Sequence, residues 1–244
     1  MPRKIDKLFA FDFDDTLAIT NSIIGVRRVN SSGHADEGFM DWILDHSLDF
    51  ESVDNRGTHD EIIWFSSEDY AKYEEKSRKD LNYLNANQLK DEFDFSKTAS
   101  VDLENTSPID NVLSIAKEAQ STSNSLVVII TARSGNQNLF SLSGRSVKPT
   151  NQSDISQFLA DQGLSISDSD INTAGDSGGS PSAKAQIMRS YIDNYNPEEV
   201  YFYDDSSGNV NAIADLCQDY FPHVKIRTFI VGENGSVSLS RECV

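Results

Sequence analysis

Residues 7–16 read Lys-Leu-Phe-Ala-Phe-Asp-Phe-Asp-Asp-Thr, and this stretch decides the expected fold. A short apolar run that ends abruptly in acids is typical of a buried strand in a parallel sheet. Ligands of open α/β sheets bind at the carboxyl ends of strands, which is where Asp12 and Asp14 would then lie. Because clustered carboxylates repel one another, the stretch predicts a hard divalent metal ion beside them. Taken alone, it is more often an acidic turn that caps a helix, so the metal-site interpretation depends on features further along the chain.

The rest of the chain alternates between strand-like and helix-like segments after one long interruption. Apolar runs at residues 126–130, 171–174, 200–203 and 224–231 predict strands. Helices are expected to begin at Ser107-Pro108, to cover residues 153–162, to begin at Ser180-Pro181, and to cover residues 209–220. Gly163 suits the position just after the second of these helices. The alternation predicts an α/β fold with a doubly wound, mostly parallel sheet.

Residues 18–106 form the interruption, and we expect them to be an insertion into a core made of residues 1–17 and 107–244. The insertion holds 19 acidic and 9 basic residues, a net charge of −10. Residues 67–84 within it predict a helix, and the remainder reads as irregular. A segment that directly follows a catalytic strand is well placed to be a lid over the site. The alternative is a surface elaboration without a catalytic part.

Polar residues at the ends of other predicted elements join the two aspartates. Thr131 follows the second strand, Lys184 lies in the helix that begins at Ser180-Pro181, and Asp204-Asp205 follows the fourth strand. Each of these residues alone is more often a cap or a solvated side chain. Together, and in this order, they are specific, because all lie at the carboxyl edge of the expected sheet or in the loop beyond it.

In these four positions the chain closely resembles the haloacid dehalogenase superfamily of phosphohydrolases. Members of that family carry Asp-x-Asp-x-Thr after the first strand, a Thr or Ser after the second, a Lys before the last motif, and an acidic pair or Gly-Asp-x-x-x-Asp after the fourth. The chain offers residues 12–16, Thr131, Lys184 and residues 204–209. The resemblance covers residues 5–17 and about 107–231, and it leaves the insertion uncovered.

The resemblance implies a phosphomonoesterase that works through an aspartyl-phosphate. Asp12 would be the nucleophile, and Asp14 would protonate the leaving alcohol and later activate water. Thr131 would hydrogen-bond a phosphoryl oxygen, and Lys184 would neutralise charge on Asp12 and the phosphoryl group. The expected cofactor is Mg²⁺, held by Asp12, by the backbone carbonyl of Asp14 and by an acid of the fourth motif.

Two acids compete for that last ligand position. When residues 204–209 are aligned with Gly-Asp-x-x-x-Asp, Asp205 takes the ligand position, so we favour it as the direct ligand. Asp204 is then expected in the outer shell or in contact with Lys184. Asn209 stands where the family has its second acid, and this departure removes one charge from the metal site.

Three arginines are candidates for substrate binding. Thr131-Ala132-Arg133 and the acidic end of the fourth strand resemble small bacteriophage-type members and the phosphatase half of polynucleotide kinases, which removes 3′-phosphates. Arg133 is expected to bind a second phosphate or a base, or else to pair with a surface acid. Arg27-Arg28 is an adjacent basic pair in the otherwise acidic insertion and is expected to touch the leaving group or to be solvated. The expected substrates are a nucleotide, a nucleic-acid 3′-phosphate end or a small phosphometabolite. The alternatives are a phosphotransferase or mutase that uses the same aspartate, and a binding protein without activity.

The composition of the chain argues against several kinds of binding partner. The 244 residues carry a net charge of −18, which argues against an extended nucleic-acid footprint or binding to an anionic membrane. No apolar run is long enough for a membrane span, and no secretory signal is visible. Cys217 and Cys243 lack metal-site spacing and are expected to be free thiols, which favours a reducing, cytoplasmic location. The sequence is silent on the oligomeric state.

Overall fold

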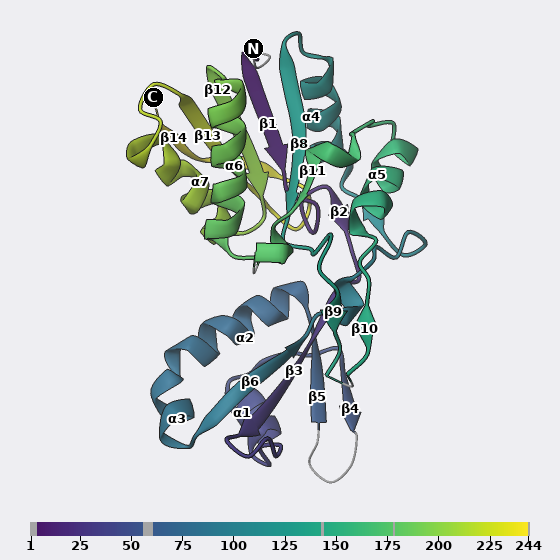
Figure 1. The fold of residues 1–244 in the computed structure, drawn as a ribbon, viewed down its shortest axis with the longest axis vertical. Coiled ribbons are helices and arrows are strands. Elements are labelled where there is room, and N and C mark those ends of the chain that lie inside the picture. Colours follow the sequence, from purple (N-terminus) through teal and green to yellow (C-terminus); the bar gives the residue numbers. More distant parts are fainter. Residues whose placement is uncertain (1–3, 56–60, 143, 178, 244) are drawn as a thin grey trace. The chain divides into compact units, whose positions relative to one another are not determined.

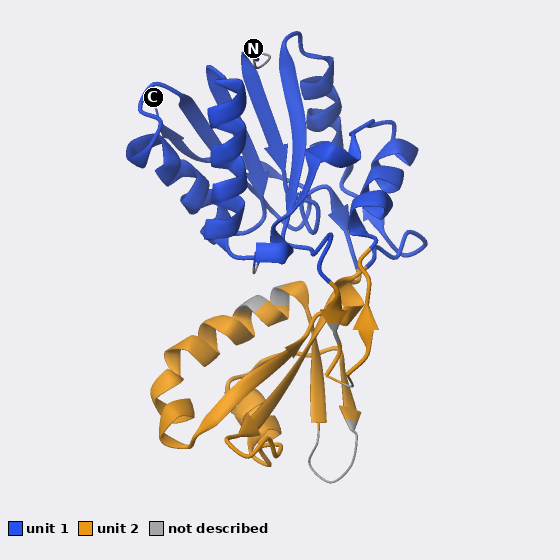
Figure 2. Ribbon diagram, in the orientation of Figure 1, with its two compact units in different colours: residues 1–20, 100–137, 150–244 blue, residues 21–99, 138–149 orange. Residues whose placement is uncertain are grey.

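The computed structural model describes residues 4–55, 61–142, 144–177 and 179–243, which divide into two compact units (Figures 1 and 2). Unit 1 consists of Met1–Thr20, Ser100–Gln137 and Thr150–Val244, and unit 2 consists of Asn21–Ala99 and Asn138–Pro149. The second segment of unit 2 was not expected from the sequence, which suggested one insertion at residues 18–106. The chain therefore passes between the units four times.

Unit 1 is an α/β fold with a mostly parallel central sheet, as predicted. The strand order is β11-β8-β1-β12-β13-β14, and only β14 pairs antiparallel. The strands are β1 Lys7–Phe11, β8 Ser125–Thr131, β11 Ile171–Thr173, β12 Glu199–Asp204, β13 Lys225–Val231 and β14 Val237–Cys243. The predicted strands coincide with β1, β8, β11, β12 and β13 to within about two residues, the usual uncertainty of such boundaries. The sequence reading missed β14.

Helices cover both faces of this sheet (Figure 1). They are α4 Asp110–Ser121, α5 Asn151–Asp161, α6 Pro181–Tyr195 and α7 Ser207–Asp219. Alternate side chains of β1 enter two separate cores, because successive residues of a strand point to opposite faces. Phe9 and Phe11 pack with α4 and α5, whereas Leu8 and Ala10 pack with α6 and α7. The first strand therefore lies in the interior, buried on both sides.

The register of the parallel strands brings the ends of β1, β8 and β12 to one level. Phe11 lies opposite Tyr203 on one side and Ile129 on the other. The residue after β1, the end of β8 and the end of β12 thus meet at the carboxyl edge of the sheet. Those positions are Asp12, Thr131 and Asp204.

Two helix starts illustrate where local sequence rules held and where they failed. The prediction for α6 is confirmed, because the Ser180 side chain accepts a hydrogen bond from the Ala183 amide and Pro181 is the first helical residue. The prediction for α4 is wrong, because Ser107–Pro108 is a short strand, β7, paired with β2 at Ala18–Ile19. The Ile109 amide donates to Leu17 O, so tertiary pairing holds these residues extended and the helix begins later.

Unit 2 is a folded domain and not the irregular stretch that its composition suggested. Its antiparallel sheet has the order β4-β5-β3-β6. Its described elements are β3 Ile23–Asn30, α1 Phe39–Asp45, β4 Ser52–Asn55, β5 Glu61–Ser66, α2 Ser67–Lys79, α3 Leu81–Ala86, β6 Leu89–Asp94, β9 Leu139–Phe140 and β10 Ser146–Val147. The helix expected at residues 67–84 is broken at Asp80 into α2 and α3. Charged residues inside β3 and β6 hid these strands from the sequence reading.

The two cysteines do not remain free, which corrects the sequence expectation. Cys217 on α7 is bonded to Cys243 on β14, with 6.3 Å between their Cα atoms. The bond joins the last helix to the edge strand of unit 1. The argument for a reducing compartment rested on free thiols, so it no longer holds. Among the described residues, no helix combines the length and apolarity that crossing a membrane requires.

Candidate functional site

A buried charge cluster lies at the carboxyl edge of the unit 1 sheet. The Nζ atom of Lys184, which α6 carries, is 3.0 Å from Asp12 Oδ1 and 2.9 Å from Asp204 Oδ2. Lys184 and Asp204 are each 0 % exposed, and Asp12 is 6 % exposed. One ammonium group thus lies between the carboxylates that follow β1 and end β12. The structure brings these three residues together as their places on the predicted elements suggested.

Asp204 is the most constrained of the acids. Its Oδ1 accepts hydrogen bonds from the Ser206 amide at 2.8 Å and from Asn209 Nδ2 at 2.9 Å. Its Oδ2 accepts from Lys184 at 2.9 Å. With both oxygens bonded by protein donors, Asp204 orients the lysine. Asn209, which stands where the resembling family has an acid, acts here as a donor to Asp204.

The charges of the cluster displace the pKa values of its members. Burial raises the pKa of Asp12 well above its ordinary value, and the nearby Asp204, Asp205 and Asp14 carboxylates add to that rise against the opposing effect of Lys184. Burial lowers the pKa of Lys184, but the two adjacent carboxylates outweigh it, so the pKa of the lysine is raised overall. The ammonium group is therefore held charged.

Asp205 has a different environment from its neighbour. Asp205 is exposed as a residue, but its carboxylate lies in the acidic cluster with Asp12 and Asp204. Its amide donates to Thr16 Oγ1 at 3.1 Å, and the Thr16 hydroxyl lies 3.4 Å from Asp205 Oδ1. Desolvation and the Asp204 carboxylate raise the pKa of Asp205 to about 7. Thr16 follows the two aspartates in residues 7–16, but the pattern of that stretch does not indicate its role in holding the loop after β12.

The acids fit a hard divalent cation. One carboxylate oxygen from each of Asp12, Asp204 and Asp205 lies within 4.8 Å of the others. Oδ1 of Asp12 is buried and makes no hydrogen bond among the described residues, although the lysine ammonium is close. Beyond its ion pair with Lys184, this oxygen can take a further partner, and carboxylate oxygens from neighbouring acids are the ligands that Mg²⁺ prefers. Since Asp204 is engaged by protein donors, Asp12 and Asp205 are the side chains best placed to hold such an ion.

Asp14 belongs to a second ion pair beside the first. Arg133 donates to it from Nη2 at 2.7 Å and from Nε at 3.0 Å, and the Thr20 hydroxyl donates to Oδ1 at 2.5 Å. Thr131 Oγ1 lies 3.4 Å from Oδ2. Burial would raise the pKa of Asp14, but the guanidinium and these hydrogen bonds outweigh it and hold that pKa below its ordinary value. Asp14 is accordingly a carboxylate at neutral pH.

Arg133 is located differently from either expectation. Its side chain is buried, and besides Asp14 it binds Ser100 O at 2.9 Å and Asn151 Oδ1 at 3.1 Å. A guanidinium engaged in this way is unavailable for a second phosphate, and it is no surface charge. The sequence reading missed Thr20, Ser100 and Asn151, because they come from segments far apart in the chain and form no motif.

Arg27 and Arg28 belong to unit 2. Arg28 is buried there, with Nε 2.8 Å from Asp91 Oδ1 and its guanidinium against the rings of Phe39 and Trp42. Arg27 is ion-paired with Glu92 at 2.7 Å. Arg28 is a core residue of unit 2, so it cannot be the substrate contact that the sequence suggested.

The loop after Thr131 is held by Asp176. The carboxylate of Asp176 accepts hydrogen bonds from the amides of Gly135, Asn136 and Gln137, at 3.1 to 3.2 Å. A Cβ atom at Gly175 would collide with the Ala132 carbonyl oxygen, so the two loops pack too closely for any larger residue. This contact stabilises the segment that carries Thr131 and Arg133.

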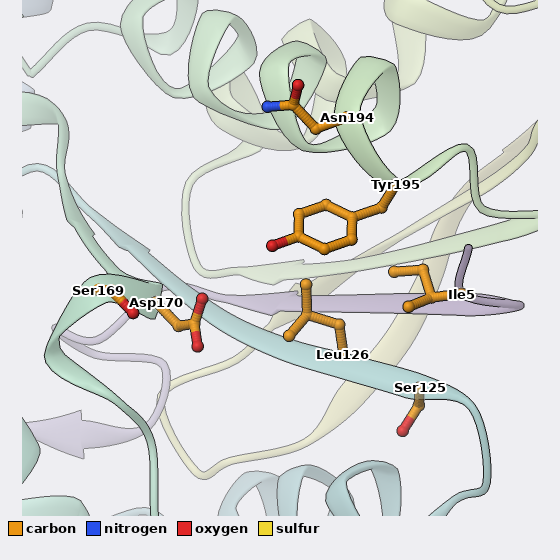
Figure 3. Close-up of a pocket in the computed structure, with 7 residues that line it drawn as sticks. All are labelled: Ile5, Ser125, Leu126, Ser169, Asp170, Asn194 and Tyr195. Atoms are coloured by element: carbon orange, nitrogen blue, oxygen red, sulfur yellow. The ribbon is translucent and has the colours of Figure 1, made fainter. Parts of the chain in front are cut away.

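A pocket of about 540 Å³ lies elsewhere in unit 1, and Figure 3 shows its lining. Three of its residues, Ile5, Ser125 and Asp170, lie at or just before the starts of strands, and Asn194 and Tyr195 lie at the end of α6. Ser125 begins β8 and Thr131 ends it, so the pocket is about 20 Å from the charge cluster at a rise of roughly 3.3 Å per residue. It is therefore a separate feature from the candidate site.

Comparison with known proteins adds no family: no family model, no curated protein and no solved structure matches this chain.

Proposed function

We propose that the chain is a Mg²⁺-dependent phosphomonoesterase that forms an aspartyl-phosphate on Asp12. The observation that carries this proposal is the buried Asp12 carboxylate, ion-paired with the Lys184 ammonium at 3.0 Å, two residues before the half-buried Asp14 carboxylate. A nucleophile of this kind needs a nearby cation to neutralise the incoming phosphate, and it needs an acid/base group within reach. The proposal extends to a haloacid-dehalogenase-like core in unit 1 and a cap in unit 2.

The first half-reaction follows from the placement of the side chains. An oxygen of Asp12 attacks phosphorus, the bond to the ester oxygen breaks, and its electron pair leaves with that oxygen. Asp14 supplies the proton that the leaving oxygen takes up. The negative charge of the bound phosphoryl group raises the pKa of Asp14, which favours the protonated form that this step requires. Lys184 and the Thr131 hydroxyl stabilise charge that develops on the phosphoryl oxygens.

In the second half-reaction Asp14 acts as a base. Its carboxylate form, which Arg133 and Thr20 stabilise, accepts a proton from water as the water attacks phosphorus. The bond between phosphorus and Asp12 then breaks, and inorganic phosphate is released. A Mg²⁺ ion held by Asp12, Asp205 and the Asp14 carbonyl would supply positive charge against the phosphate oxygens.

Few cations remain for the rest of a substrate. Arg133 is engaged by Asp14, Ser100 and Asn151, so Lys184 is the basic side chain of the cluster itself. A net charge of −18 disfavours long polyanions. We therefore propose a substrate with one phosphate near a small leaving group: a nucleotide, a 3′-phosphate end of a short oligonucleotide, or a small phosphometabolite. A phosphotransferase that uses the same aspartyl-phosphate is the second candidate, because an acceptor alcohol could replace water.

The proposal is tested with para-nitrophenyl phosphate and the full chain. Turnover is expected to require Mg²⁺, to stop with a chelator and to return when Mg²⁺ is restored. Asp12→Asn should reduce turnover to background because the amide is a poor nucleophile. Asp219→Asn, on the exposed end of α7, should keep the wild-type rate. Turnover by Asp12→Asn at the wild-type rate would exclude the covalent mechanism. Transfer of phosphate to an added alcohol in preference to water would favour the phosphotransferase.

A further inference from the structure

The Arg133 guanidinium lies close to the points where the chain passes between the units. The chain leaves or re-enters unit 1 at Thr20, Ser100, Gln137 and Thr150, which we call the crossing residues. All four are members of unit 1, and so is Arg133. The contacts that hold them are therefore contacts inside one compact unit.

Arg133 reaches the segments at three of the crossings. Nη1 donates to Ser100 O at 2.9 Å and to Asn151 Oδ1 at 3.1 Å, the latter one residue after a crossing. Nη2 lies 3.4 Å from the Thr20 hydroxyl oxygen. The same guanidinium holds Asp14 through Nε and Nη2. Its donors form a rigid planar fork, so displacement of one partner tilts the group away from the others.

Further side chains complete this network. The Thr20 hydroxyl donates directly to Asp14 Oδ1 at 2.5 Å. Asp154 Oδ2 accepts from the Val101 amide at 3.1 Å and from the Thr150 hydroxyl at 2.6 Å, which joins two crossings. The amide of Gln137 donates to Asp176 at 3.2 Å. Each crossing thus has a side-chain hydrogen bond, and three of them connect to the Asp14 carboxylate through Arg133.

Because Arg133 is buried, losing one of its hydrogen bonds costs stability. The Arg133 side chain is 4 % exposed, so water cannot readily replace a partner that moves away. A buried polar network of this kind is stable when every member is satisfied and loses stability when one is removed. The position of Asp14 therefore depends on partners that come from segments far apart in the chain.

We propose that Arg133 is a positioning residue that couples the place of the Asp14 carboxylate to the crossing residues. Asp14 is held in its acid/base position only while Thr20, Ser100 and Asn151 are bonded, so a displacement at these connections lowers turnover without any contact with substrate. The catalytic meaning of this coupling rests on the proposed function. The coupling itself is a property of the folded chain and can be measured without substrate.

Hydrogen exchange of the full chain, read by mass spectrometry, tests the coupling. Thr20→Val removes one hydroxyl, and Arg133→Met removes the guanidinium. Both variants should exchange about tenfold faster at residues 18–22, 100–102 and 150–153 together, as the loss of a buried, charge-assisted hydrogen bond implies. Faster exchange only next to the substituted residue would overturn the coupling. If Arg133→Met does not fold, Thr20→Val still decides the matter.

Matched controls lie in the same unit. Thr228→Val alters a buried threonine whose hydroxyl has no hydrogen-bond partner among the described residues. Arg227→Met removes an arginine that binds Glu199 and Glu242. Neither should change exchange at the crossing residues. An equal acceleration in these controls would show general destabilisation and would overturn the proposal.

Kinetics separate positioning from substrate contact. Thr20→Val should lower kcat about tenfold and leave KM within about twofold, because it displaces Asp14 and touches no substrate. Arg133→Lys keeps the charge without the fork and should also lose kcat. A raised KM with unchanged kcat would instead make these residues substrate contacts and would overturn the proposal. If the wild-type protein hydrolyses no phosphate ester, the proposed function fails, whereas the exchange experiment still decides the coupling.

Discussion

At the scale of single residues, charge neutralisation at Lys184 explains how a strand end can carry so many acids. Its ammonium is fully buried between Asp12 and Asp204, at 3.0 and 2.9 Å. A buried charge without a partner is strongly unfavourable, so each of the three groups depends on the others. The pair of Asp14 and Arg133 is built on the same principle.

Replacing the lysine should therefore destabilise the fold in a pH-dependent way. Without the ammonium, Lys184→Met leaves two buried carboxylates, and its free energy of unfolding should fall by about 3 kcal/mol at pH 7.5. The loss should be smaller at pH 5, because burial raises the pKa of Asp12 and loss of the ammonium removes the group that opposes this rise, so protonation of Asp12 removes part of the unpaired charge. Urea unfolding at the two pH values, with chelator present, measures the difference. Lys117→Met on the exposed face of α4 is the control. An equal loss at both pH values would contradict this account.

At the scale of elements, α7 connects the candidate site to the edge of the sheet. Its first turn carries Asn209, which donates to Asp204 at 2.9 Å, and near its end Cys217 is bonded to Cys243 of β14. The disulfide closes a loop with a sequence separation of 26 residues. A cross-link of this kind stabilises a protein mainly by restricting the unfolded chain.

A stability measurement and a thiol titration distinguish this disulfide from the two free thiols expected from the sequence. The double variant Cys217→Ser with Cys243→Ser should lower the free energy of unfolding by about 3 kcal/mol, the value typical of a loop of this length. Thiol titration of the unfolded, unreduced wild-type protein should find no free thiol. Two titratable thiols per chain, with no loss of stability in the double variant, would show that the bond does not form.

The loop that carries Thr131 and Arg133 yields a second prediction at this scale. Gly175→Ala places a methyl group against the Ala132 carbonyl oxygen, so the loop must move. Turnover should fall by at least about tenfold, because small displacements of positioning groups are costly in catalysis. Gly144→Ala is the control, because nothing lies within 4 Å of the added atom, although its φ of +79° makes that substitution mildly strained. Full activity of Gly175→Ala would show that this packing is unimportant for the site.

At the scale of the whole molecule, the chain is strongly acidic, and acids also gather where a cation is expected, at Asp12, Asp204 and Asp205. The chain carries a net charge of −18, and the pKa values of Asp12 and Asp205 are raised, that of Asp205 to about 7. A carboxyl whose folded pKa is raised binds a proton in the folded state that the unfolded state has already lost. Its contribution to stability is therefore present at low pH and disappears as the pH rises through about 7.

In the metal-free protein, this dependence of stability on pH should be directly measurable. The melting temperature of the metal-free protein should fall between pH 5 and pH 8, and Mg²⁺ should raise it more at pH 8 than at pH 5, because the ion binds the ionised carboxylates. Asp205→Asn should weaken both effects. Thermal unfolding with chelator and with Mg²⁺ at each pH measures them. A Mg²⁺ effect that is the same at both pH values, or that persists in Asp205→Asn, would argue against these ligands.

Local patterns accounted for unit 1 because its elements follow simple rules. The apolar run before Asp12 becomes β1, the serine and proline at residues 180–181 start α6, and Gly163 has a φ of +80° just after α5. The carboxyl ends of parallel strands necessarily share one edge of a sheet, so the meeting of Asp12, Thr131 and Asp204 could be expected from order alone. Whether a segment forms a strand or a helix in unit 1 depends mainly on residues close together in the chain, so the sequence alone could predict it.

The remaining features arise from contacts between segments distant in the chain. Arg133 reaches Asp14, Ser100 and Asn151, and no spacing in the sequence announces those partners. The sequence suggested that Arg28 touches the leaving group or is solvated, but ring contacts and Asp91 make it a core residue of unit 2. Residues 107–108 became a strand, and the two cysteines became a disulfide, through tertiary pairing. A side chain's charge is written in the sequence, but its partner and its burial depend on which distant segments the fold brings beside it.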